Sequence, residues 1–341
     1  MEKITKINEK NEIKNYLNIN TSTKKNNEIT ETKDKFTINI DNYKDFNIEN
    51  IKKVSSIKTK NTGEIILLKD KSILSFNDSE FSVYRLHGDK YECDIYNNRS
   101  SYIRSMIQLD DENIIIGEKY KILKLIKLKE KDFEIIQKIE IKIESPEMKV
   151  LSNGKIIVYS FCSKEIYFYS YTKENNLILD DKFINTKNAH VNDICEINKK
   201  VIAISCSGDW RWSKVSIIFY DLEKNKIIKN ISTKENYLYF CYMNENSLMA
   251  IYDKIYLIDL INYKIIDKIS KKNKDKLLGT ILKINEKGFI VVRDNIYYYE
   301  IENNKRIVFK GQNLFSVNYV SKYPGNKLLI STNKSIDIYQ I

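Results

Sequence analysis

The chain has 341 residues, of which 42% are hydrophobic, and its 57 Lys and Arg against 46 Asp and Glu give a formal net charge of +11. A hydrophobic fraction of this size is typical of globular proteins and excludes a wholly disordered chain. No stretch approaches the ~18 consecutive apolar residues of a membrane helix, and the charged N-terminus lacks the apolar region of a secretory signal.

Polar residues dominate the start of the chain, and we predict a mostly disordered tail over residues 1–50. Residues 1–34 are charged, rich in Asn and Thr and almost free of aromatic residues, which is typical of disordered segments. Residues 35–51 contain more aromatic residues. This second stretch either packs against the folded domain or serves as a linear motif for a partner, and we favour packing.

Short β-rich runs recur through residues 51–341, separated by clusters of Asn, Asp, Lys and Ser. Each unit contains an apolar strand, a turn, a second apolar strand, a polar turn and a third strand, as in SLMAIYDKIYLIDL and GFIVVRDNIYYYEI. The third strands are predicted to end at Leu86, Leu128, Tyr171, Leu222, Leu260, Ile301 and Ile341. A spacing of roughly 40–45 residues is typical of the four-stranded blades of a β-propeller.

A fourth strand follows every predicted third strand except the last one, as in FEIIQKIEI and NLILDDKF. The last blade would therefore have an unpaired edge, which is an aggregation hazard. The segment KKVSSIKTK, residues 52–60, precedes the first inner strand and has no partner in its own blade. We predict that this N-terminal strand completes the last blade and closes the ring.

The stretch AHVNDICEINKKVIAISCSGDWRWSKVSIIFYDL resembles the repeat unit of the WD40 family. His190 stands where the family has its Gly-His pair, and Ser205 and Ser207 stand in the second strand. Asp209 follows in the next turn, and Tyr220-Asp221 replaces the Trp-Asp pair. The resemblance implies an all-β, seven-bladed WD40-like β-propeller, with six or eight blades as alternatives. It also implies that His190, Ser205 and Asp209 form a structural hydrogen-bonded network within the blade.

Catalytic and metal-binding motifs are absent from the sequence. The two histidines, His87 and His190, have no recognisable nucleophile beside them, and the five cysteines match no zinc or redox spacing. Nucleotide-binding glycine motifs are missing, and Asp110-Asp111-Glu112 is interpreted as a solvated turn rather than a calcium site. The innermost strands, such as IRSMIQL and EMKVLSN, are mostly apolar. We therefore predict no enzymatic activity, no cofactor and no metal.

One turn between a second and a third strand is longer than the others. It runs over residues 208–214 and contains both tryptophans, Trp210 and Trp212, on either side of Arg211. In the WD40 family such turns lie on one face of the ring, the top face, together with the loops that lead into each inner strand. Trp and Arg dominate binding hot spots, so we predict that Trp210, Arg211 and Trp212 contact a partner. The alternative is that one tryptophan folds back as a local cap.

These observations predict a non-enzymatic scaffold that binds peptides or domains of other proteins on its top-face loops. We expect a monomer within a larger complex, in the cytoplasm or in the nucleus. The positive charge accompanies a general excess of Ile, Lys, Asn and Tyr, and does not by itself predict nucleic acid. The alternative is a propeller enzyme, or a small-ligand or phospholipid binder, that uses the central channel or the basic loop of Lys271, Lys272, Lys274 and Lys276.

Overall fold

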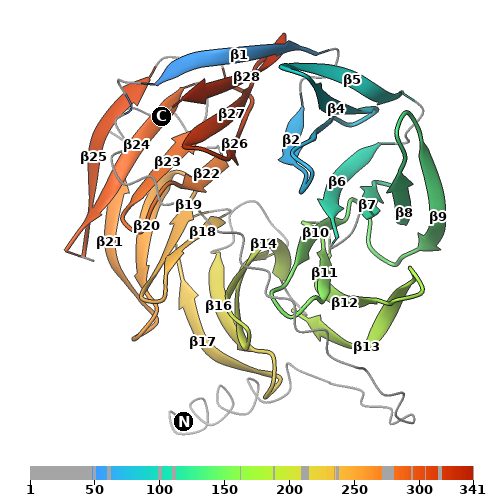
Figure 1. Cartoon of the computed structure of the whole chain (residues 1–341). Helices are drawn as coiled ribbons and strands as arrows, with labels where there is room; N and C mark the ends of the chain where they lie inside the picture. The colour runs from blue at the N-terminus through green and yellow to red at the C-terminus, as the bar shows by residue number, and fades with distance from the viewer. Residues whose placement is uncertain are drawn as a thin grey trace, which may run out of the picture.

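Seven four-stranded antiparallel sheets form the part of the chain that the computed structural model describes. The described residues are 48, 51–59, 63–98, 102–109, 113–161, 163–186, 189–208, 215–233, 235, 238–270, 280–292, 295–303, 305–313 and 317–340. The sheets stand around a common centre as blades of a ring (Figure 1). The predicted all-β, seven-bladed propeller is confirmed, and the alternatives of six or eight blades are wrong. Within these ranges, no helix is long and apolar enough to cross a membrane.

The blades follow one another along the chain, and within each blade the strands are ordered from the centre of the ring outwards. The first three blades contain β2 (Glu64–Leu67), β3 (Ile73–Phe76), β4 (Phe81–His87) and β5 (Lys90–Asn97); β6 (Ile103–Gln108), β7 (Asn113–Glu118), β8 (Ile122–Leu128) and β9 (Phe133–Glu140); and β10 (Glu147–Val150), β11 (Ile156–Tyr159), β12 (Glu165–Tyr171) and β13 (Leu177–Asn185).

The remaining four blades continue this order, except that the last one takes its outer strand from the beginning of the chain. They contain β14 (Ala189–Asn198), β15 (Val201–Gly208), β16 (Ser216–Asp221) and β17 (Lys226–Ser232); β18 (Tyr239–Asn244), β19 (Ser247–Ile251), β20 (Lys254–Asp259) and β21 (Lys264–Ser270); β22 (Thr280–Lys283), β23 (Gly288–Val292), β24 (Ile296–Glu302) and β25 (Arg306–Asn313); and β26 (Tyr319–Tyr323), β27 (Lys327–Ser331), β28 (Ser335–Gln340) and β1 (Lys52–Lys58).

The ring closes where β1 pairs antiparallel with β28, as the sequence predicts. Ser56 Oγ donates a hydrogen bond to Asp337 Oδ1 over 2.6 Å, and Lys53 Nζ lies 2.8 Å from Asp337 Oδ2. Ile57 is 5% exposed and packs with Ile65 of the first blade and Ile336 of the last blade. The closing strand therefore contributes both polar and apolar contacts to the junction between the first and last blades.

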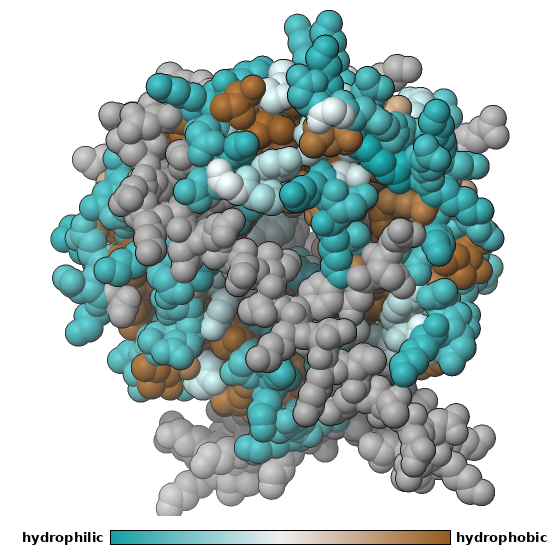
Figure 2. Space-filling model, viewed as in Figure 1, coloured by the Kyte–Doolittle hydropathy of each residue, from teal (hydrophilic) through white to brown (hydrophobic). Residues whose placement is uncertain are grey.

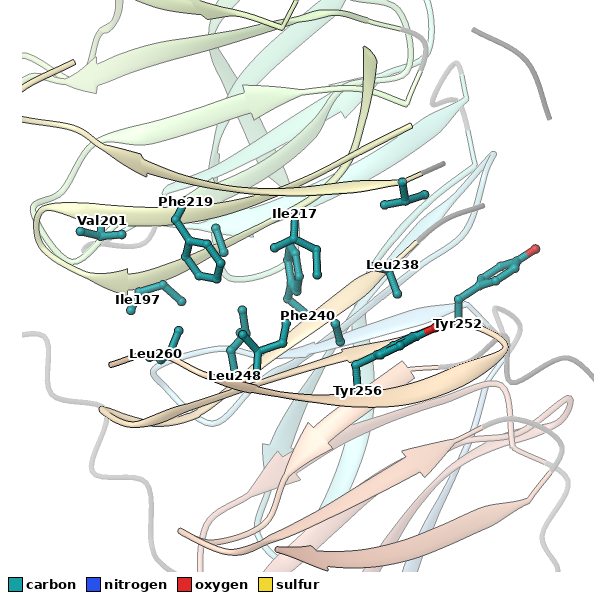
Figure 3. Close-up of a cluster of buried hydrophobic side chains, with 14 residues drawn as sticks. Ile197, Val201, Ile217, Phe219, Leu238, Phe240, Leu248, Tyr252, Tyr256 and Leu260 are labelled. Carbon is teal, nitrogen blue, oxygen red and sulfur yellow. The ribbon is translucent and has the colours of Figure 1, made fainter. Parts of the chain in front are cut away.

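Hydrophobic side chains fill the spaces between neighbouring blades, because both faces of every sheet are covered. Each of the seven described clusters combines residues of two adjacent blades. Figure 3 shows the cluster between the fourth and fifth blades, where Ile217 and Phe219 of β16 point toward Phe240 and Leu248 of β18 and β19. Burial of one such side chain contributes about 1.5–3 kcal/mol, so the stability of the ring is spread over all its interfaces.

Two residues that precede β1 are also part of the core. Ile48 is 3% exposed and Ile51 is 8% exposed, and both pack in the cluster between the sixth and last blades, beside Tyr298 and Tyr339. Ile48 also approaches Gly311 so closely that a Cβ added there would lie 2.9 Å from Ile48 Cγ2. The other residues of the predicted tail lie outside the described ranges.

Candidate functional site

The innermost strand of each blade borders the axis of the ring (Figure 1). Four antiparallel strands return the chain to the same face before the next blade begins, so all seven inner strands run in the same direction. Their first residues therefore lie on one face, which is the top face defined above. Glu64, Arg104, Glu147, Tyr239 and Tyr319 stand at or next to these first positions. We call this set the channel entrance. Figure 2 shows a hollow near the centre of the ring, and the coloured part of its border is hydrophilic or neutral.

Arg104 is held in place by residues of the neighbouring blade. Its Nε lies 2.9 Å from Glu147 Oε1, and its guanidinium carbon lies 5.5 Å from the centre of the Phe161 ring. The ion pair and the cation–π contact fix the plane of the guanidinium. Among the described residues, its two Nη groups have no hydrogen-bond partner, so they remain available to a ligand.

Glu64 lies close to this pair but is not neutralised by it. No described residue forms a hydrogen bond or an ion pair with its carboxylate. The Glu64 side chain is exposed to the channel. The protein that surrounds the channel nevertheless displaces part of the water around the Glu64 carboxylate. This desolvation, together with the negative charge of Glu147, raises the pKa of Glu64 to about 7 against the opposing effect of Arg104. Desolvation also raises the pKa of Glu147, and Arg104 again opposes the shift.

A cavity of about 490 Å³ opens beside Glu64 and Arg104, between the first and second blades. The beginnings of β2 and β6 and the turn between β3 and β4 form its wall, and the lining residues are Gly63, Glu64, Phe76, Asn77, Asp78, Ser79, Ile103 and Arg104. Asn77 Oδ1 shapes the turn by accepting hydrogen bonds from the amides of Ser79 and Glu80, over 3.0 and 3.1 Å. A Cβ on Gly63 would lie 1.7 Å from the Phe76 carbonyl oxygen, so this close approach requires glycine.

Asp193 of β14 connects three blades beside the axis. Its Oδ1 lies 2.6 Å from Lys149 Nζ of the third blade and accepts a hydrogen bond from Tyr159 over 3.2 Å. Its Oδ2 accepts a hydrogen bond from the amide of Phe240 in the fifth blade over 2.7 Å. The amide of Ile194 donates to Oδ1 over 2.8 Å. This buried carboxylate is thus fully used by the protein and has a structural role.

The charged channel entrance differs from the mostly apolar channel that the inner strands predict. Met106 and Met148, which made these strands read as apolar, are buried between blades, whereas Arg104 and Glu147 in the same strands gather at the axis. Among the described residues, no group of three His, Cys, Asp or Glu side chains is arranged to hold a metal ion. The expected absence of a metal and of a cofactor remains a prediction.

The predicted hot-spot residues Trp210, Arg211 and Trp212 lie outside the described ranges, as does the basic loop that contains Lys271. The base of the tryptophan loop is described. Val215, which follows it, is fully buried, and its amide donates to the carbonyl of Glu235 over 3.2 Å. The amide of Thr233 donates to the Val215 carbonyl over 2.8 Å. Val215, the first described residue after the loop, is therefore fixed in the blade.

The predicted structural network is only partly covered by the described residues. Ser205 in β15 is fully buried and lies opposite Asp193 in β14, whereas His190 lies opposite Ser207. Asp209, the third member of the predicted network, lies outside the described ranges. The network of His190, Ser205 and Asp209 therefore remains a prediction.

His87, the second histidine, is not free in solvent. Its Nε2 lies 2.9 Å from Asp94 Oδ1, between the last residue of β4 and the middle of β5. Arg85 also contacts Asp94, with Nη1 3.4 Å from Oδ2. The cluster lies on the outer part of the first blade, away from the channel entrance, and we assign it a local structural role.

No family model and no curated protein matches the chain. Among solved structures, the crystal structure of the WD40 β-propeller domain of Doa1 has a TM-score of 0.64 at 12% identity and covers 85% of this chain and 97% of its own. The crystal structure of the mitotic checkpoint complex contains a chain with a TM-score of 0.63 at 9% identity, covering 93% of this chain and 99% of its own. These likenesses establish the WD40 β-propeller fold, as the sequence resemblance predicts.

Proposed function

We propose that this WD40-type propeller is a non-enzymatic scaffold that binds segments of partner proteins on its top face, as a monomer within a larger complex. WD40 propellers commonly mediate protein interactions, which supports this class of function. The observation that carries the proposal is the coincidence of recognition features on one face. The channel entrance and the cavity beside it lie on the face at which β15 ends at Gly208, next to the point from which the sequence continues to Trp210, and they are presented on a rigid ring.

The tryptophan loop is the proposed anchor of this interface. Its base is held by hydrogen bonds between Val215 and the segment around Thr233 and Glu235. Glu235 is 3% exposed, and its Oε1 lies 3.0 Å from Lys254 Nζ. A loop that is fixed at its base loses less conformational entropy when it binds, which favours affinity.

The experiment isolates partners by affinity purification with the full chain and then measures binding of the variants Trp210→Ala, Arg211→Ala and Trp212→Ala separately. At least one variant should weaken binding about thirty-fold, which corresponds to a hot-spot loss of ~2 kcal/mol, with an almost unchanged melting temperature. Ser213→Ala is the matched control within the same loop. If all three variants bind normally, or if all three lower the melting temperature strongly, the loop is structural and the proposed anchor is wrong.

One observation favours a second candidate, a small-ligand or catalytic channel. Burial raises the pKa of Glu64 to about 7 beside the second carboxylate of Glu147, and enzymes use carboxyl groups tuned in this way as general acids. A thermal-shift screen with neutral saccharides and with nucleotides separates the two candidates. A scaffold should not be stabilised by either class, whereas stabilisation that is lost in Glu64→Gln would favour the second candidate.

A further inference from the structure

We propose that the cavity between the first and second blades binds a basic side chain, lysine or arginine, of a partner peptide, with Glu64 and Asp78 as its counter-ions. This inference rests on the proposed function, because the side chain belongs to a segment that lies across the top face. It adds the chemical class of the ligand and the residues that recognise it.

The distribution of charge in the cavity determines the sign of the ligand. Two carboxylates, Glu64 and Asp78, and one guanidinium, Arg104, line it. Arg104 is paired with Glu147, at 2.9 Å between Nε and Oε1. Within the described residues, neither Glu64 nor Asp78 has a hydrogen bond or an ion pair to its carboxylate. Among the described residues, the negative charge of the cavity is therefore not fully compensated, although the chain has a formal net charge of +11.

The size and lining of the cavity suit a long amphipathic side chain. Its volume of about 490 Å³ falls within the roughly 300–1,000 Å³ of typical ligand sites. Phe76 and Ile103 line the cavity with the small surface that they expose, 3% each, and Glu64 and Asp78 line the same cavity. Lysine and arginine bury an apolar stem and carry the charge at its end, so one side chain can use both kinds of surface. An anion on Arg104 is the opposing possibility, and the two carboxylates disfavour it.

Binding of a cation should be linked to ionisation of Glu64. The charged and titratable groups that act on Glu64 are Arg104 of β6, Glu147 of β10 and Tyr319 of β26, and Asp78 of the β3–β4 turn lines the same cavity. Desolvation and the charge of Glu147 raise the pKa of Glu64 to about 7, so a large fraction of it is protonated at neutral pH. A cation binds the ionised form. The affinity should therefore increase as the pH rises through 7 and decrease as the pH falls below 7, by about tenfold between pH 6 and pH 8.

The test uses the full chain and four capped tripeptides, Gly-X-Gly, in which X is arginine, lysine, citrulline or glutamate. Dissociation constants are measured by NMR titration at pH 6 and at pH 8. At pH 8 the arginine or the lysine peptide should bind at least about tenfold more tightly than the citrulline peptide, and this preference should shrink at pH 6. The proposal is overturned if the citrulline peptide binds as tightly as the cationic peptides, if the glutamate peptide binds more tightly than they do, or if neither cationic peptide binds.

Agmatine, a free guanidino amine, distinguishes the source of the cation. If the cavity serves a peptide, the arginine tripeptide should bind more tightly than agmatine, because its backbone adds contacts at the channel entrance. If agmatine binds as tightly as the tripeptide or more tightly, the ligand is a free cation and the proposed peptide source is wrong.

Substitutions assign the effect to Glu64. Glu64→Gln keeps the shape of the side chain and removes its charge. It should therefore raise the dissociation constant of the cationic peptide at least about tenfold at pH 8 and abolish the dependence of binding on pH. Glu92→Gln, at an exposed carboxylate on the outer strand of the same blade, is the matched control and should bind like the unmodified chain. Equal affinity of the Glu64→Gln chain and the unmodified chain contradicts the assignment.

The two proposals fail in different ways. If an isolated partner depends on the tryptophan loop but binds Glu64→Gln normally, the scaffold function stands and the basic-side-chain site is wrong. If the arginine peptide binds in a Glu64-dependent manner while the chain captures no partner, the site stands and the scaffold function is wrong.

Discussion

Ile57→Asp is expected to lower the free energy of unfolding by roughly 3–5 kcal/mol, or to prevent folding altogether. Ile57 is 5% exposed within the cluster that joins the first and last blades. The substitution removes about 1.5–3 kcal/mol of hydrophobic stabilisation and places a carboxylate among the apolar side chains of this cluster. Because a domain of this kind is stable by only about 5–15 kcal/mol, this change removes a large fraction of the total.

Val54→Asp is the matched control for this prediction, because Val54 lies on the same closing strand but is 53% exposed. It should change the melting temperature little. Urea denaturation of both variants, followed by circular dichroism, measures the difference. Equal stability of the two variants would show that β1 does not hold the ring closed.

Two truncations test closure of the ring independently. Removal of residues 1–47 retains the buried Ile48 and Ile51 and the whole of β1, and it should leave a folded monomer. Removal of residues 1–59 also deletes β1, exposes the edge of β28 and leaves Asp337 without Ser56 and Lys53. We expect the longer truncation to aggregate or to melt at a clearly lower temperature, since an open edge strand pairs with other chains. Light scattering measures aggregation of the two truncated chains, and thermal melts measure their stability. If both truncated chains are monomeric and melt at the same temperature, β1 does not close the ring.

The blade pattern could be predicted because it depends on local sequence. Strand alternation and polar turns are properties of a few consecutive residues, and they recur in every repeat. The predicted ends of the third strands lie within one residue of the observed ends. For example, Leu86 was predicted where β4 ends at His87, and Leu260 was predicted where β20 ends at Asp259. Closure by residues 52–60 was also predictable, because one strand was missing at one end and one was in excess at the other.

The channel entrance could not be predicted from the same patterns. Arg104 and Glu147 lie in different repeats, and their ion pair forms only because neighbouring blades bring equivalent inner strands together. In the sequence, each charge is one of several polar residues that alternate with apolar ones, as in IRSMIQL and EMKVLSN, and such residues are usually solvated. In the folded ring the inner strands bring these charges together around the axis. Burial there and the charge of Glu147 raise the pKa of Glu64. The signal would have been visible only by aligning the inner strands with one another.

Asp193→Ala is the second substitution with a large expected effect, a loss of about 3 kcal/mol in the free energy of unfolding. Asp193 is 6% exposed and accepts hydrogen bonds from the Phe240 amide over 2.7 Å and from Lys149 over 2.6 Å. Bonds to a charged group contribute about 1.5–3 kcal/mol each. Removal of the carboxylate leaves the Phe240 amide without this acceptor, whereas Lys149 keeps its hydrogen bond to the Ile194 carbonyl. Lys149 retains partial access to solvent, which limits the cost of its lost partner.

Asp193→Asn separates the charge from the shape of this junction. The amide keeps the volume and one acceptor oxygen, but its NH₂ group faces the donors of Lys149 or Phe240, so the loss should be intermediate between that of alanine and none. Asp89→Ala, at an exposed turn after β4, is the control and should melt like the unmodified chain. Urea denaturation measures all three variants, and hydrogen exchange at the Phe240 amide reports the local effect. If Asp193→Ala is as stable as Asp89→Ala, the carboxylate does not connect the blades, and its hydrogen bonds to the neighbouring blades add nothing to the stability of the ring.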